Sequence, residues 1–417
     1  MKTSLLHALT RLQFTTPTPI QEKTIPVGLS GKDIIGVAQT GTGKTLAFGV
    51  PLIERLGTIG GRGLVLLPTR ELAVQVNEVL QKVGAGLGLR TAVLIGGDSM
   101  FKQKGQLAKN PHVLIATPGR LLDHLEQKTV SLSSVRVLVL DEADRMLDMG
   151  FAPQIKKILL SVPKERQTML FSATMPAEIV KLSAAHMKLP VRVEIAPPGT
   201  GAENVMHELF FVHRESKPRL LEKLLKEYHG TVLIFSRTKY GAKRIAHLVR
   251  SFGHTAAEIH SNRSLNQRLE ALEGFKKGKY RVLAATDIAA RGIDVRGIEL
   301  VLNYDLPDNP SDYVHRIGRT GRAGEPGRAI SFATPEQRRD VQDIERLMRI
   351  ALPVSQTPEL PRSKAVQGLP ERQPFAHRTS RGFQRSNGTH AFSSEHPRSA
   401  GRFHGRNRRR GRRAARQ

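Results

Sequence analysis

Ala38-Gln39-Thr40-Gly41-Thr42-Gly43-Lys44-Thr45 is the stretch that decides the fold of this chain. An apolar run at 33–37 precedes it, and a helix-like run at 46–56 follows it. Strand, glycine-rich turn and helix are the context that a phosphate-binding loop requires. Glycines let backbone N–H groups turn toward phosphate oxygens, and the helix N-terminus adds partial positive charge there. A chance glycine turn is the alternative, and the flanking strand and helix argue against it.

Two side chains of this loop carry its expected chemistry. Lys44 is placed to reach the β- and γ-phosphates of a nucleotide, and Thr45 to offer its hydroxyl to Mg²⁺. Ala38 stands where such loops usually begin with glycine. We therefore expect residues 38–45 to bind a nucleoside triphosphate with Mg²⁺.

The composition limits what kind of protein this is. The 417 residues allow two or three domains, and 39% hydrophobic with 24% charged residues is typical of a soluble globular chain. We expect no membrane span and no signal peptide, because long apolar runs are missing. The chain has no cysteine, which excludes disulfides, thiolate catalysis and zinc–cysteine sites. A cytoplasmic location is the expectation.

The net charge of +28 points to a polyanionic partner, most simply nucleic acid. Much of the excess lies in residues 361–417, which hold 15 lysines and arginines against two acids, Glu371 and Glu395. From about residue 353 the chain is rich in Arg, Gly, Ser, His and Pro, with phenylalanines between the arginines. Such a segment cannot bury enough apolar surface to fold alone, so a disordered tail that binds single strands is predicted. A merely solubilising tail is the alternative.

Short apolar segments alternate with helix-like stretches along the rest of the chain. In the first half they are 64–67, 92–95, Val113–Ala116, Val135–Leu140 and 169–171, and in the second half Val232–Phe235, Ala256–Ile259, 281–285, 299–304 and 329–332. This alternation predicts parallel sheets covered on both faces, with ligand loops at the carboxyl ends of the strands. A Pro- and Gly-rich stretch separates the halves. We expect domains at 1–196 and 205–352, a linker at 197–204 and the tail at 353–417.

Asp141 and Glu142 directly follow the strand at Val135–Leu140. A carboxylate at that position can hold Mg²⁺, and the next one can orient or deprotonate an attacking water. The alternative is structural, because an acidic residue at this point could simply be the N-cap of the following helix. Because a phosphate loop lies upstream, we expect catalysis here.

Gln21 lies just before the phosphate loop, after an extended segment that Pro17 and Pro19 enforce. Its amide can donate and accept at once, which matches the N6/N7 edge of adenine. An ordinary glutamine at a helix start is the alternative.

The second half has no glycine-lysine loop, but it has arginines at 316, 319 and 322, one every third residue. A solvated basic face or an RNA contact would explain them. So would arginine fingers, which reach a phosphate bound to the other domain.

Together, these motifs resemble those of the DEAD-box RNA helicases, whose name Asp141-Glu142-Ala143-Asp144 spells, and by tail and size the bacterial RhlE-like group. The resemblance covers about residues 5–350 and implies two tandem RecA-like parallel-sheet domains of the α/β class, with ATP and Mg²⁺ as cofactors and RNA as partner. It also implies that hydrolysis accompanies closure of the two domains on single strands or short duplexes.

The resemblance assigns roles to further residues. It implies an adenine site at Phe14 and Gln21, a metal site at Thr45 and Asp141, catalysis by Lys44, Asp141, Glu142, Arg319 and Arg322, and a ribose contact at Asp294, with Asp287 orienting the arginines. Coupling residues would be Ser172, Thr174 and His315. RNA contacts would be Arg70, Gly97, Thr117, Arg120, Arg237, Arg268 and Thr286, with Ser236 and Gly292 as neighbours.

Two features depart from the family pattern. The aromatic that stacks on adenine upstream of Phe14 has no counterpart, so stacking is weaker or the true start lies upstream. Leu265 stands where a glutamine is usual, so one hydrogen bond on the RNA side or between domains is in question.

Two rival functions are an RNA chaperone that anneals strands through its tail, and a DNA translocase. Ribosomal precursors and RNA-decay ribonucleases are the expected partners in the cell, and a monomer is the expected state.

Overall fold

The computed structural model describes residues 3–39, 41–195, 205–290, 295, 297–321 and 326–359. Thr40, Gly292, Asp294 and Arg322 lie outside these residues, as does the chain from residue 360 onward, so the roles expected of them stay predictions.

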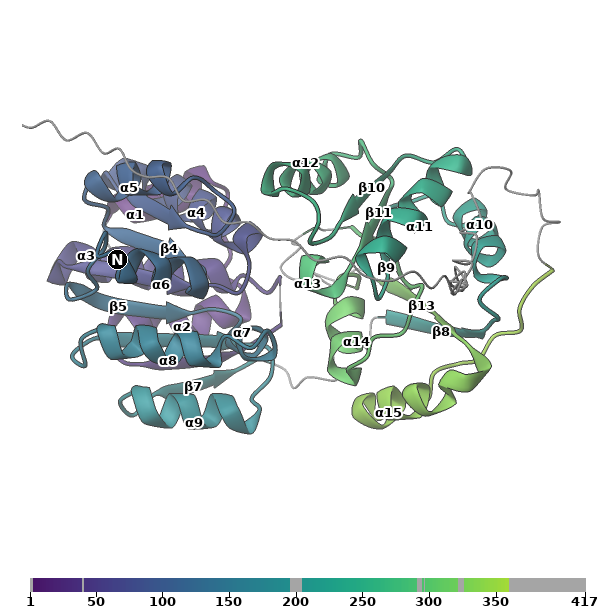
Figure 1. Cartoon of the computed structure of the whole chain (residues 1–417). Helices are drawn as coiled ribbons and strands as arrows, with labels where there is room; N and C mark the ends of the chain where they lie inside the picture. Colours follow the sequence, from purple (N-terminus) through teal and green to yellow (C-terminus); the bar gives the residue numbers. More distant parts are fainter. Residues whose placement is uncertain are drawn as a thin grey trace, which may run out of the picture. The chain divides into compact units, whose positions relative to one another are not determined.

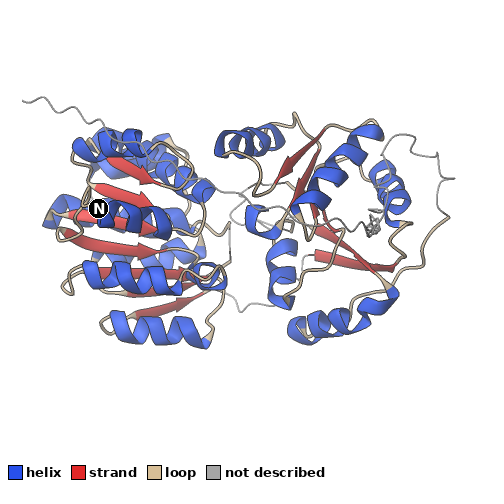
Figure 2. Ribbon diagram, viewed as in Figure 1, coloured by secondary structure: helices blue, strands red, loops and turns tan. Residues whose placement is uncertain are grey.

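The first domain is a seven-stranded parallel sheet in the order β3-β4-β2-β5-β6-β1-β7, with helices on both faces (Figures 1 and 2). Its strands are β1 (Ile34–Val37), β2 (Arg62–Leu66), β3 (Thr91–Leu94), β4 (Val113–Ala116), β5 (Val135–Leu140), β6 (Gln167–Ser172) and β7 (Val191–Glu194). Its helices are α1 (Thr3–Arg11), α2 (Pro19–Leu29), α3 (Lys44–Ile59), α4 (Arg70–Gly84), the 3₁₀ turn η1 (Ala85–Leu87), α5 (Met100–Ala108), α6 (Pro118–Glu126), α7 (Ala143–Asp148), α8 (Ala152–Ser161) and α9 (Ala177–His186).

Alternate residues of each central strand face opposite layers of helices. Val139 of β5 packs in the cluster that contains Phe48 of α3, whereas Leu140 packs in the cluster that contains Leu121 of α6. Because both faces are covered, these strands read as continuous apolar runs, and the sequence therefore locates them well.

The second domain repeats this plan with the order β10-β11-β9-β12-β13-β8, again all parallel (Figure 2). Its strands are β8 (Val205–Phe211), β9 (Val232–Phe235), β10 (Ala256–Ile259), β11 (Val282–Ala285), β12 (Leu300–Asn303) and β13 (Gly327–Ala333). Its helices are α10 (Lys217–Glu227), α11 (Lys239–Ser251), α12 (Leu265–Lys276), α13 (Asp287–Ala290), α14 (Pro310–Ile317), the 3₁₀ turn η3 (Pro335–Gln337) and α15 (Arg338–Met348).

Two strands were missed by the sequence analysis, β7 and β8. Both lie at the edge of their sheet, with a neighbouring strand on one side only. In β7, Arg192 and Glu194 are exposed and pair with each other at 2.8 Å. In β8, Met206 is exposed. An edge strand can keep polar or partly exposed positions, so it has no continuous apolar run from which a strand could be predicted.

Residues 353–355, which the sequence analysis assigns to the start of the tail, pair with β8. Val354 forms a parallel bridge with Leu209, and the Leu209 N–H donates to the Pro353 carbonyl at 2.8 Å. The Ser355 N–H in turn donates to the Leu209 carbonyl at 2.9 Å. Free backbone groups at the β8 edge hold this segment against the second domain. Within the described residues, no helix is long and apolar enough to cross a bilayer.

Candidate functional site

The loop between β1 and α3 has the backbone that a phosphate cradle needs. Gly41 and Gly43 adopt φ of 87° and 92°, a region that L side chains rarely enter. A Cβ on Gly43 would also collide with the Gln21 amide. The Thr42 hydroxyl donates to the Gln39 carbonyl at 2.8 Å, which closes the turn.

Gln21 is tied to this loop. Its Oε1 accepts from the Thr18 N–H at 3.0 Å, and its Nε2 donates to the Gly43 carbonyl at 3.0 Å. The amide therefore sits beside the phosphate loop, at the capped start of α2. Phe14 is 47% exposed, which leaves its ring accessible to a ligand.

Lys44 and Asp141 place opposite charges in a buried setting at the carboxyl edge of the sheet. Lys44 begins α3 and donates through Nζ to the Ala38 carbonyl at 3.1 Å. Asp141 follows β5 and is 4% exposed. Burial raises the pKa of Asp141 to about 6, although the nearby Lys44 ammonium opposes the rise. A carboxylate that burial destabilises favours a cation, so these residues fit Mg²⁺ with a nucleotide.

Glu142 has φ of 52° and is the N-cap residue of α7. Its carboxylate accepts from the Arg145 guanidinium at 2.6 Å, and both side chains are almost fully buried. Sequence reasoning missed Arg145, although its i,i+3 spacing from Glu142 on a helix was a usable signal.

Asp144 links the β5 edge to the segment that follows β6. Its Oδ2 accepts from the Ala173 N–H, the Thr174 N–H and the Thr174 hydroxyl at 3.0, 2.8 and 2.9 Å. Its own N–H donates to the Ser172 hydroxyl at 3.2 Å. Ser172 and Thr174, the expected coupling residues, are thus held by the residue next but one to Glu142.

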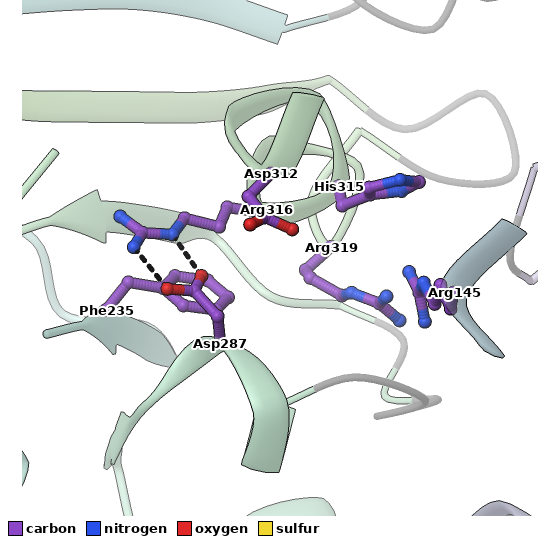
Figure 3. Close-up of a pocket in the computed structure, with 7 residues that line it drawn as sticks. All are labelled: Arg145, Phe235, Asp287, Asp312, His315, Arg316 and Arg319. Carbon is purple, nitrogen blue, oxygen red and sulfur yellow. Dashed lines mark hydrogen bonds and ion pairs between the residues drawn. The ribbon is translucent and has the colours of Figure 1, made fainter. Parts of the chain in front are cut away.

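In the second domain, Asp287 holds Arg316 in a bidentate ion pair at 2.5 and 2.7 Å (Figure 3). Arg316 is 1% exposed, and it also donates to the Asn303 side chain and the Asp305 carbonyl. Arg316 is therefore bound within its own domain, which agrees with its exclusion from the expected fingers.

Arg319 and His315 extend from the same segment as Arg316 and line one pocket with Arg145 (Figure 3). Burial, together with the Arg145 charge, lowers the pKa of His315 to about 4, although Asp144 opposes the change. The imidazole is therefore neutral near pH 7. The pocket brings the predicted finger and the predicted coupling histidine toward the arginine that holds Glu142.

The buried Asp287–Arg316 pair supports a stability prediction. Asp287→Asn leaves an almost fully buried guanidinium without its counter-ion, which should lower the free energy of unfolding by about 3 kcal/mol. Urea denaturation followed by circular dichroism measures this change. Asp343→Asn is the matched control, because its pair with Arg346 is exposed and should change stability by less than about 1 kcal/mol. Equal losses in the two variants would contradict a structural role for Asp287.

The expected RNA contacts of the first domain lie at the carboxyl edge of its sheet. Arg70 begins α4, and its guanidinium lies so close to Gly97, which has φ of 75°, that a Cβ there would collide with it. Thr117 caps α6, and the Arg120 Nη1 donates to the Asp98 carbonyl at 3.0 Å. The structure brings these four residues to one edge, as predicted for ligand loops.

The residues of the second domain that are expected to contact RNA differ in the partners they have in this structure. Thr286 directly follows β11, and its N–H donates to the Ile259 carbonyl at 3.2 Å. The Arg237 Nε pairs with Asp308 at 3.2 Å. Arg268, by contrast, pairs with the buried Glu71 of α4 at 2.9 Å, an acidic partner that sequence reasoning did not predict.

Leu265 and Arg268 lie on the same helix, α12. Leu265 packs against the apolar cluster of the first domain. At this position the chain thus makes an apolar contact where the resemblance implies an amide hydrogen bond.

The first domain has a phosphate loop with buried Lys44 and Asp141. The second parallel-sheet domain carries Arg319, which lines a pocket with the Arg145 that binds Glu142. These features define a two-domain P-loop nucleoside triphosphatase. The family models for DEAD/DEAH box helicases and for the helicase conserved C-terminal domain match residues 18–182 and 216–324. The chain belongs to the DEAD-box family and is an ATP-dependent RNA helicase.

Similar proteins are found in both fungi and bacteria. The ATP-dependent rRNA helicase RRP3 of Debaryomyces hansenii is 44% identical over 87% of this chain and 76% of the relative. The DEAD-box ATP-dependent RNA helicase CshA of Bacillus subtilis is 41% identical over 88% of this chain and 75% of the relative.

Solved structures support the fold. The structure of S. cerevisiae Dbp5 bound to RNA and ADP BeF3 matches with a TM-score of 0.78 and 29% identity, over 86% of this chain and 94% of that one. Mss116p bound to ssRNA and AMP-PNP matches with a TM-score of 0.79 and 28% identity, over 86% of this chain and 78% of that one. Two RecA-like domains are thereby established.

Proposed function

We propose that this helicase hydrolyses ATP when RNA drives its two domains to close, and that closure opens short duplexes locally. The observation that carries the proposal is the shared pocket of Arg319, His315 and Arg145, since Arg145 holds Glu142 beside the nucleotide loop. Charge that develops on a γ-phosphoryl group would then be met from both domains. ATP and RNA bind cooperatively in this scheme, because each favours the same closed state.

Each residue of the site has one task in this mechanism. Lys44 binds the phosphates, Thr45 and Asp141 hold the metal, and Glu142 orients or deprotonates the attacking water. Mg²⁺, when bound, would neutralise phosphate charge. In the part of the chain that the structure describes, no three His, Asp or Glu side chains gather as a metal cluster. Mg²⁺ binds through one or two protein oxygens plus phosphates and water, and Thr45 and Asp141 would supply the protein oxygens.

The finer assignments rest on composition and relatives. Relatives named rRNA helicases favour ribosomal RNA precursors as substrates. The Arg-rich tail favours the RhlE-like group and an added contact to single strands. We also propose that the protein is a monomer and that it is located in the cytoplasm. Annealing by the tail would be a secondary activity.

RNA dependence is the direct test of this function. Single-stranded RNA should raise the ATPase rate, and it should raise ATP affinity by roughly 5- to 150-fold, since the two ligands share one closed state. Steady-state phosphate release and ATP binding, measured with RNA and with DNA of the same sequence, give both quantities. Equal rates with and without RNA at every salt concentration would refute coupling, and equal stimulation by DNA would favour a DNA translocase.

A further inference from the structure

A second pocket, here called the second-domain pocket, lies at the carboxyl edge of the sheet of the second domain. It has a cavity volume of about 420 Å³, within the range of pockets that hold small ligands. Its polar lining includes Arg214, Lys217, Arg237, Arg244, Tyr304 and Asp305. None of these residues belongs to the ATP site of the first domain.

The pocket occupies the place in its sheet that the ATP site occupies in the other. The order β10-β11-β9-β12-β13-β8 matches β3-β4-β2-β5-β6-β1, so β8 corresponds to β1 and β12 to β5. Lys217 begins the helix after β8, as Lys44 begins the helix after β1. Asp305 comes just after β12, as Asp141 comes just after β5. A lysine–carboxylate pair thus stands at the same point of both sheets.

Lys217 is built into the pocket rather than placed on the surface. It is 5% exposed, its Nζ donates to the Tyr304 carbonyl at 2.7 Å, and it lies 3.3 Å from the Asp305 Oδ1. An ammonium has three donors, so one further acceptor can be bound. Lys44 likewise donates to a backbone carbonyl of its own loop.

The charge of the pocket favours an anion. Three arginines and Lys217 line the pocket with one carboxylate, Asp305, and one of the arginines, Arg237, also pairs with Asp308 outside the lining. Asp305 accepts from the Ser236 hydroxyl at 3.0 Å and the Arg237 N–H at 3.2 Å. Burial lowers the pKa of Lys217, and Asp305 opposes the change. An anion next to Lys217 would stabilise the buried ammonium in the same way as Asp305 does.

The N-termini of two helices add to this charge. Lys217 begins α10, and Thr238, the cap of α11, lines the pocket. Both helices therefore direct the positive end of their dipoles toward the cavity.

We propose that the second-domain pocket binds the terminal phosphates of a small polyphosphate, of the nucleoside diphosphate class. A terminal phosphate can enter and reach the buried Lys217, whereas a phosphodiester inside an RNA strand is flanked by sugars on both sides. Ile245, Leu248 and the Tyr304 ring supply apolar surface for the rest of such a ligand.

The site binds without cleaving. Leu306 follows Asp305 where Glu142 follows Asp141, so a group that would activate water is missing at that position. The connection from β8 to α10 contains His213, Arg214 and Glu215 rather than glycines. Side-chain cations, instead of a backbone cradle, would hold the phosphates.

The test uses the full-length Lys44→Ala variant, which weakens the ATP site, with inorganic pyrophosphate and ADP as probes in isothermal titration calorimetry. Adding Arg214→Glu and Arg244→Glu, both exposed at the rim, should weaken the remaining site by roughly tenfold or more. Lys277→Glu with Arg346→Glu is the matched control, because both side chains are exposed and lie outside the pocket lining. The control pair should leave the affinity within about twofold of its parent.

Two results would overturn the proposal. If the control pair weakens binding as much as the rim pair, the probes bind through general positive charge, including that of the tail. If single-stranded RNA with a 5′-hydroxyl displaces pyrophosphate in the parent, the pocket belongs to the RNA path. Binding is read without turnover, so failure here leaves the helicase function untouched.

Discussion

Glu142→Gln should lower kcat for RNA-stimulated ATP hydrolysis by about 10²- to 10⁴-fold, the usual contribution of a positioned general base. The amide keeps the shape of the carboxylate and one oxygen for Arg145, but it cannot take a proton from water. ATP binding should therefore change little, because Lys44 and Asp141 remain in place. Single-turnover hydrolysis and equilibrium ATP binding, measured on the same preparation, separate the two effects.

The control for this variant is Glu165→Gln. Glu165 belongs to the same domain, and its exposed ion pair with Lys188 spans 2.6 Å. It should leave kcat unchanged. The pairing of Glu142 with Arg145 also demands a stability check, because a buried guanidinium loses its counter-ion in Glu142→Gln. Rapid hydrolysis by a stably folded Glu142→Gln protein would remove Glu142 from the mechanism.

The rate of duplex unwinding is a second measurement that tests the Glu142→Gln variant. If opening depends on ATP turnover cycles, repeated unwinding should fall with kcat in Glu142→Gln. Annealing through the tail needs no hydrolysis and should persist. Unwinding at the parental rate would mean that strand separation does not depend on this carboxylate.

The sequence predicts the strand tips of this fold well, for a physical reason. Buried parallel strands must be apolar along their whole length, and ligand loops must follow their carboxyl ends. Asp141 was therefore located by its position after β5, and Thr117 and Thr286, which the resemblance supplied, directly follow β4 and β11. The edge strands β7 and β8 were missed because one open side permits polar residues.

Long-range partners were much harder to predict. The contacts of Glu71 with Arg268 and of Asp144 with Thr174 join residues far apart in sequence, and no local period encodes them. The pairing of Arg145 with Glu142 could have been predicted, because the two residues are three positions apart at the start of a helix. The Asp287–Arg316 pair was anticipated only through the family resemblance, which implied that Asp287 orients arginines.

Arg319→Ala should lower kcat by about 10³-fold or more, the usual effect of losing an arginine finger, while ATP binding stays close to that of the parent. Arg319 belongs to the domain that lacks the nucleotide loop, so as a finger it should contribute only when the pocket it shares with Arg145 and His315 is formed. Arg319→Lys should recover little activity, because an ammonium cannot reproduce the planar fork of a guanidinium on phosphate oxygens. Stopped-flow phosphate release with saturating RNA measures the loss.

The matched control is Arg346→Ala, an exposed arginine of the same domain whose pair with Asp343 spans 2.9 Å. Its kcat should equal that of the parent. RNA binding in the presence of a non-hydrolysable ATP analogue adds a further distinction, since a finger stabilises the closed state as well as the transition state. Arg319→Ala should then weaken analogue-dependent RNA binding more than RNA binding alone. Full RNA-stimulated hydrolysis by Arg319→Ala would contradict the assignment of Arg319 as an arginine finger.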